Sequence, residues 1–251
     1  MLIGRVKSHL AALPSRSEDR VHEIRVSMKK VRALVLLTRP AVGREAAARA
    51  GRRARDVKNH FGSLRDADVL RDLLLDLLPP APAAAEIRRL HLEGGACEQV
   101  VADGAVAAQL DALLAATDDD RLHQLMWPDV VDGWLATYRK CRRASKVCRC
   151  RGTDGDFHSW RKRVKELLYQ SEILSDAPEV STRIPAAEKL SSLLGKHHDL
   201  SMLCERFENF HPDSPAVDVV RRLQAKIARR AFRVAGRLLN QKPSAIRRKL
   251  P

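Results

Sequence analysis

The feature that most constrains the fold of this chain is an internal repeat. The pattern His-x-x-Arg-x-x-x-Lys occurs twice, first at His22, Arg25 and Lys29 and then at His158, Arg161 and Lys165. A second pair of similar segments, 55–74 and 187–207, follows the two copies in the same order. Repetition of this kind is typical of two related halves of one fold. We therefore expect a single domain over residues 1–251, with halves at about 1–116 and 119–251.

Hydrophobic residues recur with helical spacing along nearly the whole chain, and no segment alternates as a β-strand would. The expected helices cover residues 1–13, 18–38, 42–61, 64–78, 83–116, 121–149, 156–175, 184–196, 198–210 and 215–240. Pro40 and the loop predicted at 152–155 are among the breaks between them. The run His197–His198–Asp199 is interpreted as a cap or link between two helices. The sequence therefore predicts an all-α protein.

Each copy of the repeated pattern forms a basic stripe beside an apolar one. At about 100° per residue, the three repeated residues of the first copy and Arg32 lie within an arc of about 80°. The neighbouring arc is apolar, and the second copy repeats this layout. Two further helices carry basic stripes, at Arg139, Arg142, Arg143 and Lys146 and at Arg222, Lys226, Arg229, Arg233 and Arg237. If a two-fold pseudo-symmetry brings the copies together, we expect these four helices to line one channel or groove.

Positive charge is in large excess, with a formal net charge of +15. Residues 72–120 hold ten acids and two basic residues, a net charge of −8 that leaves +23 on the rest of the chain. Self-repulsion of this size favours an anionic partner. Arginine offers planar forked donors to phosphate oxygens and lysine a mobile charge, so the stripes suit a linear polyphosphate or a nucleic-acid backbone. Spacing does not choose between the two, although an aromatic content of 4% disfavours single-strand binding.

Cysteine usage and hydropathy favour a cytoplasmic protein. The five cysteines are irregularly spaced in a chain of 251 residues, which is not typical of a disulfide framework. The N-terminus lacks the apolar segment of a signal peptide. No run approaches the roughly 20 apolar residues that span a bilayer, so we expect no membrane partner.

The sequence does not favour a metal site or a catalytic site. Cys141 and Cys148 lie on the apolar side of their helix, so we interpret them as buried small hydrophobic residues rather than zinc ligands. Helix capping or ion pairing explains the three carboxylates Asp66, Asp68 and Asp72 better than metal binding does. No nucleotide-binding loop or hydrolase motif is present. We expect no cofactor and no catalysis, with a phosphoryl-transfer or polyphosphate-processing enzyme kept as one alternative and a non-specific nucleic-acid-binding protein as another.

From about Val21 to Leu239, the chain resembles the CHAD family of conserved-histidine α-helical domains. The segments that carry the resemblance are HEIRVSMKKVR at 22–32, LRDADVL at 64–70, TYRKCRRA at 137–144, HSWRKRVKELLY at 158–169 and LLGKHHD at 193–199. The resemblance implies two pseudo-symmetric antiparallel helical bundles around a basic central cavity. It also implies binding of inorganic polyphosphate and association with polyphosphate granules.

The second copy departs from the first at two positions, because Glu166 and Leu168 stand where the first copy has Lys30 and Arg32. We therefore expect one shared anion channel whose N-terminal wall binds more strongly. The candidate polyanion-binding residues are His22, Arg25, Lys29, Lys30, Arg32, Arg65, Arg139, Arg142, Arg143, Lys146, His158, Arg161, Lys162, Lys165, Arg222, Lys226, Arg229 and Arg233.

Overall fold

The computed structural model describes residues 17–60, 66–92, 108, 111–112 and 124–250. All regular elements in these ranges are helices, which confirms the all-α prediction. They are α2 (Ser17–Val42), α3 (Arg44–His60), α4 (Asp66–Leu77), α5 (Pro80–Arg89), α8 (Trp127–Arg151), α9 (Asp154–Ile173), α10 (Pro178–Ser181), α11 (Ile184–Phe210), α12 (Ala216–Leu238) and α13 (Pro243–Arg247). Within these ranges, none of the helices combines the length and the hydropathy needed to cross a membrane.

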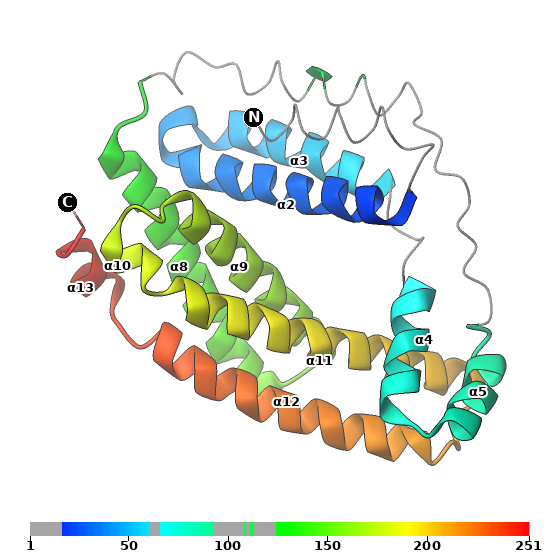
Figure 1. The fold of residues 1–251 in the computed structure, drawn as a ribbon. Helices are drawn as coiled ribbons and strands as arrows, with labels where there is room; N and C mark the ends of the chain where they lie inside the picture. The colour runs from blue at the N-terminus through cyan, green and yellow to red at the C-terminus, as the bar shows by residue number, and fades with distance from the viewer. Residues whose placement is uncertain (1–16, 61–65, 93–107, 109–110, 113–123, 251) are drawn as a thin grey trace.

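Helices that follow one another in the chain pack as antiparallel pairs, among them α2 with α3, α8 with α9 and α11 with α12 (Figure 1). α2 packs against α3, and the same helix also packs against α8 and α9. α9 packs in turn against α8 and α11, and α12 covers the other side of α11. α4 and α5 form a smaller pair beside the C-terminal part of α11 (Figure 1). The expected pseudo-symmetric pair of bundles stays a prediction, and the boundary at 116–119 lies outside the described residues.

The core is built from the apolar stripes that the sequence predicts beside the basic ones. Trp134, Tyr138 and Trp160 are fully buried, and the Trp134 and Tyr138 rings stack with centroids 5.4 Å apart. The indole nitrogen of Trp134 donates a hydrogen bond of 3.0 Å to the Ser171 hydroxyl, so this buried polar group is satisfied. The buried members of the two repeated stripes are Ile24, Met28, Val31, Val35, Phe157, Trp160, Val164 and Leu167.

A glycine allows α8 to approach α2 closely. A Cβ atom built on Gly133 would lie 1.8 Å from the carbonyl oxygen of Leu37, which no side chain tolerates. Nearby, the Gln170 side chain of α9 donates a hydrogen bond of 2.9 Å to the carbonyl oxygen of Ala33 in α2. α2 is therefore fixed against both α8 and α9, and this packing sets the direction of its basic stripe.

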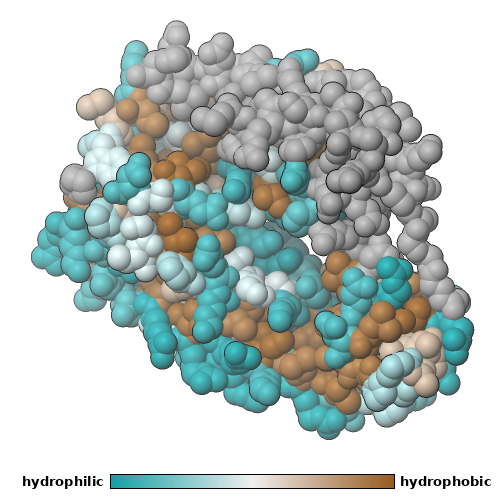
Figure 2. Space-filling model, viewed as in Figure 1, coloured by the Kyte–Doolittle hydropathy of each residue, from teal (hydrophilic) through white to brown (hydrophobic). Residues whose placement is uncertain are grey.

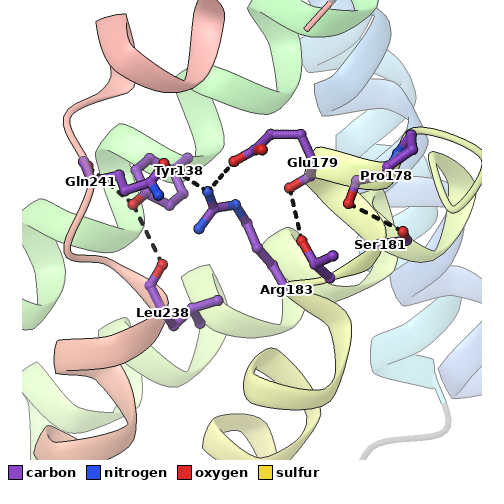
Figure 3. A network of polar contacts seen from close by, with 8 residues as sticks. Tyr138, Pro178, Glu179, Ser181, Arg183, Leu238 and Gln241 are labelled. Carbon is purple, nitrogen blue, oxygen red and sulfur yellow. Dashed lines mark hydrogen bonds and ion pairs between the residues drawn. The ribbon is translucent and has the colours of Figure 1, made fainter. Parts of the chain in front are cut away.

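Polar contacts tie the region before α11 to α8 and to the end of α12 (Figure 3). Arg183 forms an ion pair with Glu179 and donates a hydrogen bond of 3.0 Å to the side chain of Gln241. The Tyr138 hydroxyl donates to the carbonyl oxygen of Gln241 at 3.1 Å. These bonds satisfy polar groups that burial would otherwise leave without partners. They hold together three segments that are far apart in the sequence.

Several predicted helix boundaries are wrong. α11 runs without a break through His197–His198–Asp199, so this run is neither a cap nor a link. α2 continues past Pro40 to Val42, although the proline has no N–H to donate to the carbonyl of Leu36, and the chain turns at Gly43 with φ of 87°. The predicted loop at 152–155 is shorter, because α9 already begins at Asp154.

The expected helix at 83–116 also differs from the structure. α5 begins earlier, at Pro80, and ends at Arg89, after which His91 adopts a φ of 52° that no helix continues. The expected helix at 1–13 lies outside the described residues.

Candidate functional site

A cavity of about 480 Å³ lies among α2, α3, α4, α9 and α11. This face of the molecule is hollowed between α2 and α11, and hydrophilic side chains lie in the hollow (Figure 2). The cavity falls within the range of about 300–1,000 Å³ that is usual for ligand sites. Its lining residues are His22, Arg25, Lys29, Arg32, Lys58, Val69, His158, Arg161, Lys162, Lys165, Glu166, Tyr169, His198, Asp199 and Met202.

Both copies of the repeated pattern contribute all three of their residues to this one cavity. The first copy lies on α2 and the second on α9, and the two helices pack against each other. Their apolar stripes, with Met28 and Val164 fully buried, are turned into the core. Because the basic stripes lie beside the apolar ones on each helix, both are directed toward the same space. The cavity therefore gathers charge from segments far apart in the sequence.

The lining is strongly cationic. Seven of its side chains are Lys or Arg and three are His, against two carboxylates, Glu166 and Asp199. Glu166 is already paired with Arg163, whose nitrogen lies 2.7 Å from its carboxylate oxygen. The charge of Asp199 raises the pKa of Lys165, whereas burial and the charges of Arg161 and Arg25 lower it. Asp199 therefore offsets part of the repulsion between Lys165 and its cationic neighbours. The carboxylates thus neutralise part of the charge and leave the cavity with an excess of cations.

Two lysines that correspond in the repeat show how crowded these cations are. Burial lowers the pKa of Lys29 from 10.5 to about 7, and the charges of Lys165, Arg25, Arg161 and Lys58 lower it further. Burial likewise lowers the pKa of Lys165 to about 8, together with Arg161. Each of these shifts favours the neutral amine in the empty cavity. A bound polyanion would reverse the balance by favouring the ammonium form.

Two histidines face each other in the cavity, His158 from α9 and His198 from α11, with ring centroids 4.7 Å apart. Burial lowers the pKa of His198 to about 4, with Arg161 and His158 adding to the effect. The pKa of His158 is also lowered, first by burial and then by Lys162. Both rings are therefore neutral at pH 7 and can each donate one hydrogen bond to an anion.

Sequence reasoning missed Lys58 and His198 as lining residues. Lys58 lies on α3, and its counterpart in the second copy is Ser191, so the repeat gave no signal for it. The position of His198 matches that of Arg65 in the repeat, which was a usable signal. The interpretation of the run 197–199 as a cap or link between two helices gives His198 no place in the site. His197 itself is buried and stacks on Phe157 at 3.8 Å, so it is a core residue.

Nine other candidate residues do not line this cavity. Lys30 is not among the lining residues and pairs with Glu172 at 3.3 Å. The basic stripes of α8 and α12 also lie elsewhere, because the opposite, apolar faces of these helices are packed into the core. The expectation that four basic helices line one channel is corrected in this respect. The residues concerned are Lys30, Arg139, Arg142, Arg143, Lys146, Arg222, Lys226, Arg229 and Arg233, and Arg65 lies outside the described residues.

Clusters of metal-ligating side chains are not found among the described residues. Cys141 and Cys148 are buried, as the apolar side of their helix predicts. Burial raises the pKa of both thiols to about 12, so neither is a ready thiolate ligand. The side chains of Asp66 and Asp68 lie outside the described part, so the carboxylate alternative on α4 stays untested.

Comparison with known proteins identifies the family to which the chain belongs. Residues 3–208 match the sequence model of the CHAD domain, and the chain therefore belongs to the CHAD domain family. It is also 28% identical over 203 residues to two uncharacterized proteins of Mycobacterium tuberculosis, one from strain CDC 1551 / Oshkosh and one from strain H37Rv. The matched region is 72% of this chain and 38% of each relative, so the chain spans well under half of their length. No solved structure is significantly similar to the chain.

Proposed function

We propose that this member of the CHAD family binds inorganic polyphosphate in the cavity among α2, α3, α4, α9 and α11. The observation that carries the proposal is the convergence of the two His-x-x-Arg-x-x-x-Lys copies on one cavity. Arginine forks and lysine charges match the oxygens of successive phosphoryl groups, and such charge-assisted hydrogen bonds are the stronger ones. The family relationship supports the same ligand class.

The dimensions and lining of the cavity favour a thin chain of phosphates over a nucleic acid. A space of about 480 Å³ is too small to admit a duplex. A single strand would need aromatic side chains on which its bases could stack, and Tyr169 is the sole Phe, Tyr or Trp among the described lining residues. Linear polyphosphate needs neither room for bases nor stacking surfaces.

Competition binding tests the proposal against its nearest rival. Long-chain polyphosphate, DNA and RNA are matched in phosphate concentration at fixed ionic strength, because salt changes all three affinities. We expect polyphosphate to displace a labelled polyphosphate chain far better than either nucleic acid. Equal or better displacement by DNA or RNA would contradict the proposal.

A pair of variants locates the binding in the cavity. Arg25→Ala with Arg161→Ala removes one arginine from each copy, at about 1.5–3 kcal/mol for each charge-assisted bond. We expect a loss of affinity of at least about 100-fold, since about 1.4 kcal/mol is tenfold. Arg88→Ala with Lys189→Ala is the matched control, because both side chains are exposed and neither lines the cavity. Similar losses from the two pairs would mean that net charge alone does the binding.

The proposed activity is binding without chemistry. Release of orthophosphate from polyphosphate in the presence of magnesium or manganese would instead support a polyphosphate-processing enzyme. Association with polyphosphate granules would follow from binding in the cavity. Colocalisation of a fluorescent fusion with the granules, lost in the Arg25→Ala and Arg161→Ala variant, is the expected result.

A further inference from the structure

α12 carries a second concentration of positive charge that the cavity does not use. At about 100° per residue, its six basic residues from 222 onward lie within an arc of about 100°. These residues are Arg222, Lys226, Arg229, Arg230, Arg233 and Arg237, and all six are exposed. The opposite side of the helix, with Ile227, Ala231 and Ala235, is buried against the rest of the molecule. We call this set of six residues the α12 basic face.

Little in the surroundings compensates this charge. Among the described residues, none of the six forms an ion pair or a hydrogen bond, whereas neighbouring Arg221 pairs with Glu208 at 3.1 Å. The one acid of α12 is Asp218, in the first turn. Arg149 of α8 adds a further cation at the edge of the face, where its guanidinium lies 4.9 Å from the Phe232 ring. Within the part of the chain that the structure describes, the α12 basic face is thus a run of cations that no carboxylate pairs with.

The shape of this face differs from that of the cavity. α12 forms the outer edge of the molecule, and hydrophilic side chains project along that edge (Figures 1 and 2). From Arg222 to Arg237 the face is about 22 Å long at a rise of about 1.5 Å per residue. None of the six residues lines the cavity described above or the smaller pocket between α4 and the C-terminal part of α11. The face is therefore straight, open and convex.

We infer that the α12 basic face is a second anion site, separate from the cavity, that binds the backbone of a nucleic-acid duplex without reading its sequence. A duplex is stiff over about 50 nm, so its phosphates are already fixed in line before binding. It presents about one charge per 1.7 Å of axis, enough to pair every cation along the helix. A flexible polyphosphate chain would instead lose conformational freedom for contacts on one side only.

Other partners fit the face less well. A helix that binds a membrane surface inserts its apolar side among the lipids, but the apolar side of α12 is packed in the core. A specific protein interface usually has aromatic or aliphatic anchors at its centre. The exposed face of α12 offers Val219 as its sole large hydrophobic residue, near one end of the helix.

Salt-dependent binding of a short mixed-sequence DNA duplex tests the inference. Six phosphate contacts predict a slope of about −5 in a plot of log K against log salt concentration. The variant Lys226→Gln, Arg229→Gln and Arg233→Gln removes three contacts and should make that slope less steep by about 2.7. Glutamine has nearly the same helix propensity as lysine and arginine, so α12 should remain folded.

A matched control and the cavity variant separate this site from the proposed function. Arg52→Gln, Arg88→Gln and Lys189→Gln remove the same charge from exposed positions elsewhere and should leave the slope nearly unchanged. We expect the α12 variant to keep its polyphosphate affinity, and Arg25→Ala with Arg161→Ala to keep its DNA affinity. The inference is overturned if the wild type does not bind the duplex or if the α12 variant binds it no more weakly than the control. Loss of polyphosphate affinity in the α12 variant, or of DNA affinity in the cavity variant, would also overturn it.

Discussion

At the scale of single residues, burial and mutual repulsion disfavour the charged forms of the lysines in the cavity. An anionic ligand can offset both effects. Lys29 and Lys165 are both partly buried among other cations, and the pKa values of both are lowered, to about 7 and about 8. Lys29 therefore gains and loses its proton near neutral pH, whereas a lysine in water stays protonated. A polyanion in the cavity favours the ammonium form of both residues, so binding is coupled to proton uptake.

This coupling predicts that polyphosphate affinity falls as the pH rises from 7 to 9. The lysines must be protonated to pair with phosphate. For each proton that binding requires, the affinity falls by up to about tenfold for each pH unit above 7. The terminal phosphates, with a second pKa of about 6, are already ionised in this range and do not add to the change. Calorimetric titrations in buffers of different ionisation enthalpy measure the proton uptake directly.

Lys29→Arg is the control for this prediction. A guanidinium stays charged throughout this pH range, so the variant should bind with a flatter pH profile and take up fewer protons. An affinity that is independent of pH between 7 and 9 in the wild type would show that the lysines are already fully protonated in the empty cavity.

At the scale of elements, the site depends on how closely α2 lies against α8. Gly133→Ala places a methyl group on the Leu37 carbonyl and should lower the free energy of unfolding by about 1–3 kcal/mol, the usual cost of overpacking. Gly236→Ala is the matched control, since a Cβ at that helical position meets nothing within 4 Å. The control should be more stable than the wild type by about 0.5–1 kcal/mol. Denaturant unfolding measures both, and equal effects would contradict the close approach.

α12 should be destabilised by its own charge in the absence of a partner. Lys226 lies three or four residues from Arg222, Arg229 and Arg230, and each like-charged pair costs about 0.2–0.5 kcal/mol. Lys226→Gln is therefore expected to raise the free energy of unfolding by about 1 kcal/mol at low salt. The gain should disappear at high salt, where the repulsion is screened. A gain that is the same at both salt concentrations would point to some other cause.

The helices and the two repeated stripes could be predicted from the sequence because both depend on local periodicity. The apolar arcs around Met28 and Val164 and the basic arcs beside them have the predicted directions on their helices. The lining by Lys58 could not be predicted, because it depends on how α3 packs against α2. The outward direction of the α12 stripe could not be predicted either. Periodicity shows that a basic stripe exists, but not which part of the molecule it faces.

At the scale of the whole molecule, two separate clusters of cations contribute to the net charge of +15. Seven lysines and arginines line the cavity, and six more form the α12 basic face on the outer edge. The two sets belong to different helices and share no residue. The separation allows a concave site for a thin polyanion and an open, straight one for a stiff polyanion on the same fold.

The central claim is that the two copies of the repeat serve one site. Calorimetric titration with a short polyphosphate at pH 7 and fixed salt tests it most directly, using the wild type and the single variants Arg25→Ala and Arg161→Ala. We expect one binding event per chain in the wild type, and each variant should weaken that same event by about tenfold or more, the loss of one charge-assisted bond. Two binding events in the wild type, with each variant abolishing a different one, would contradict the claim.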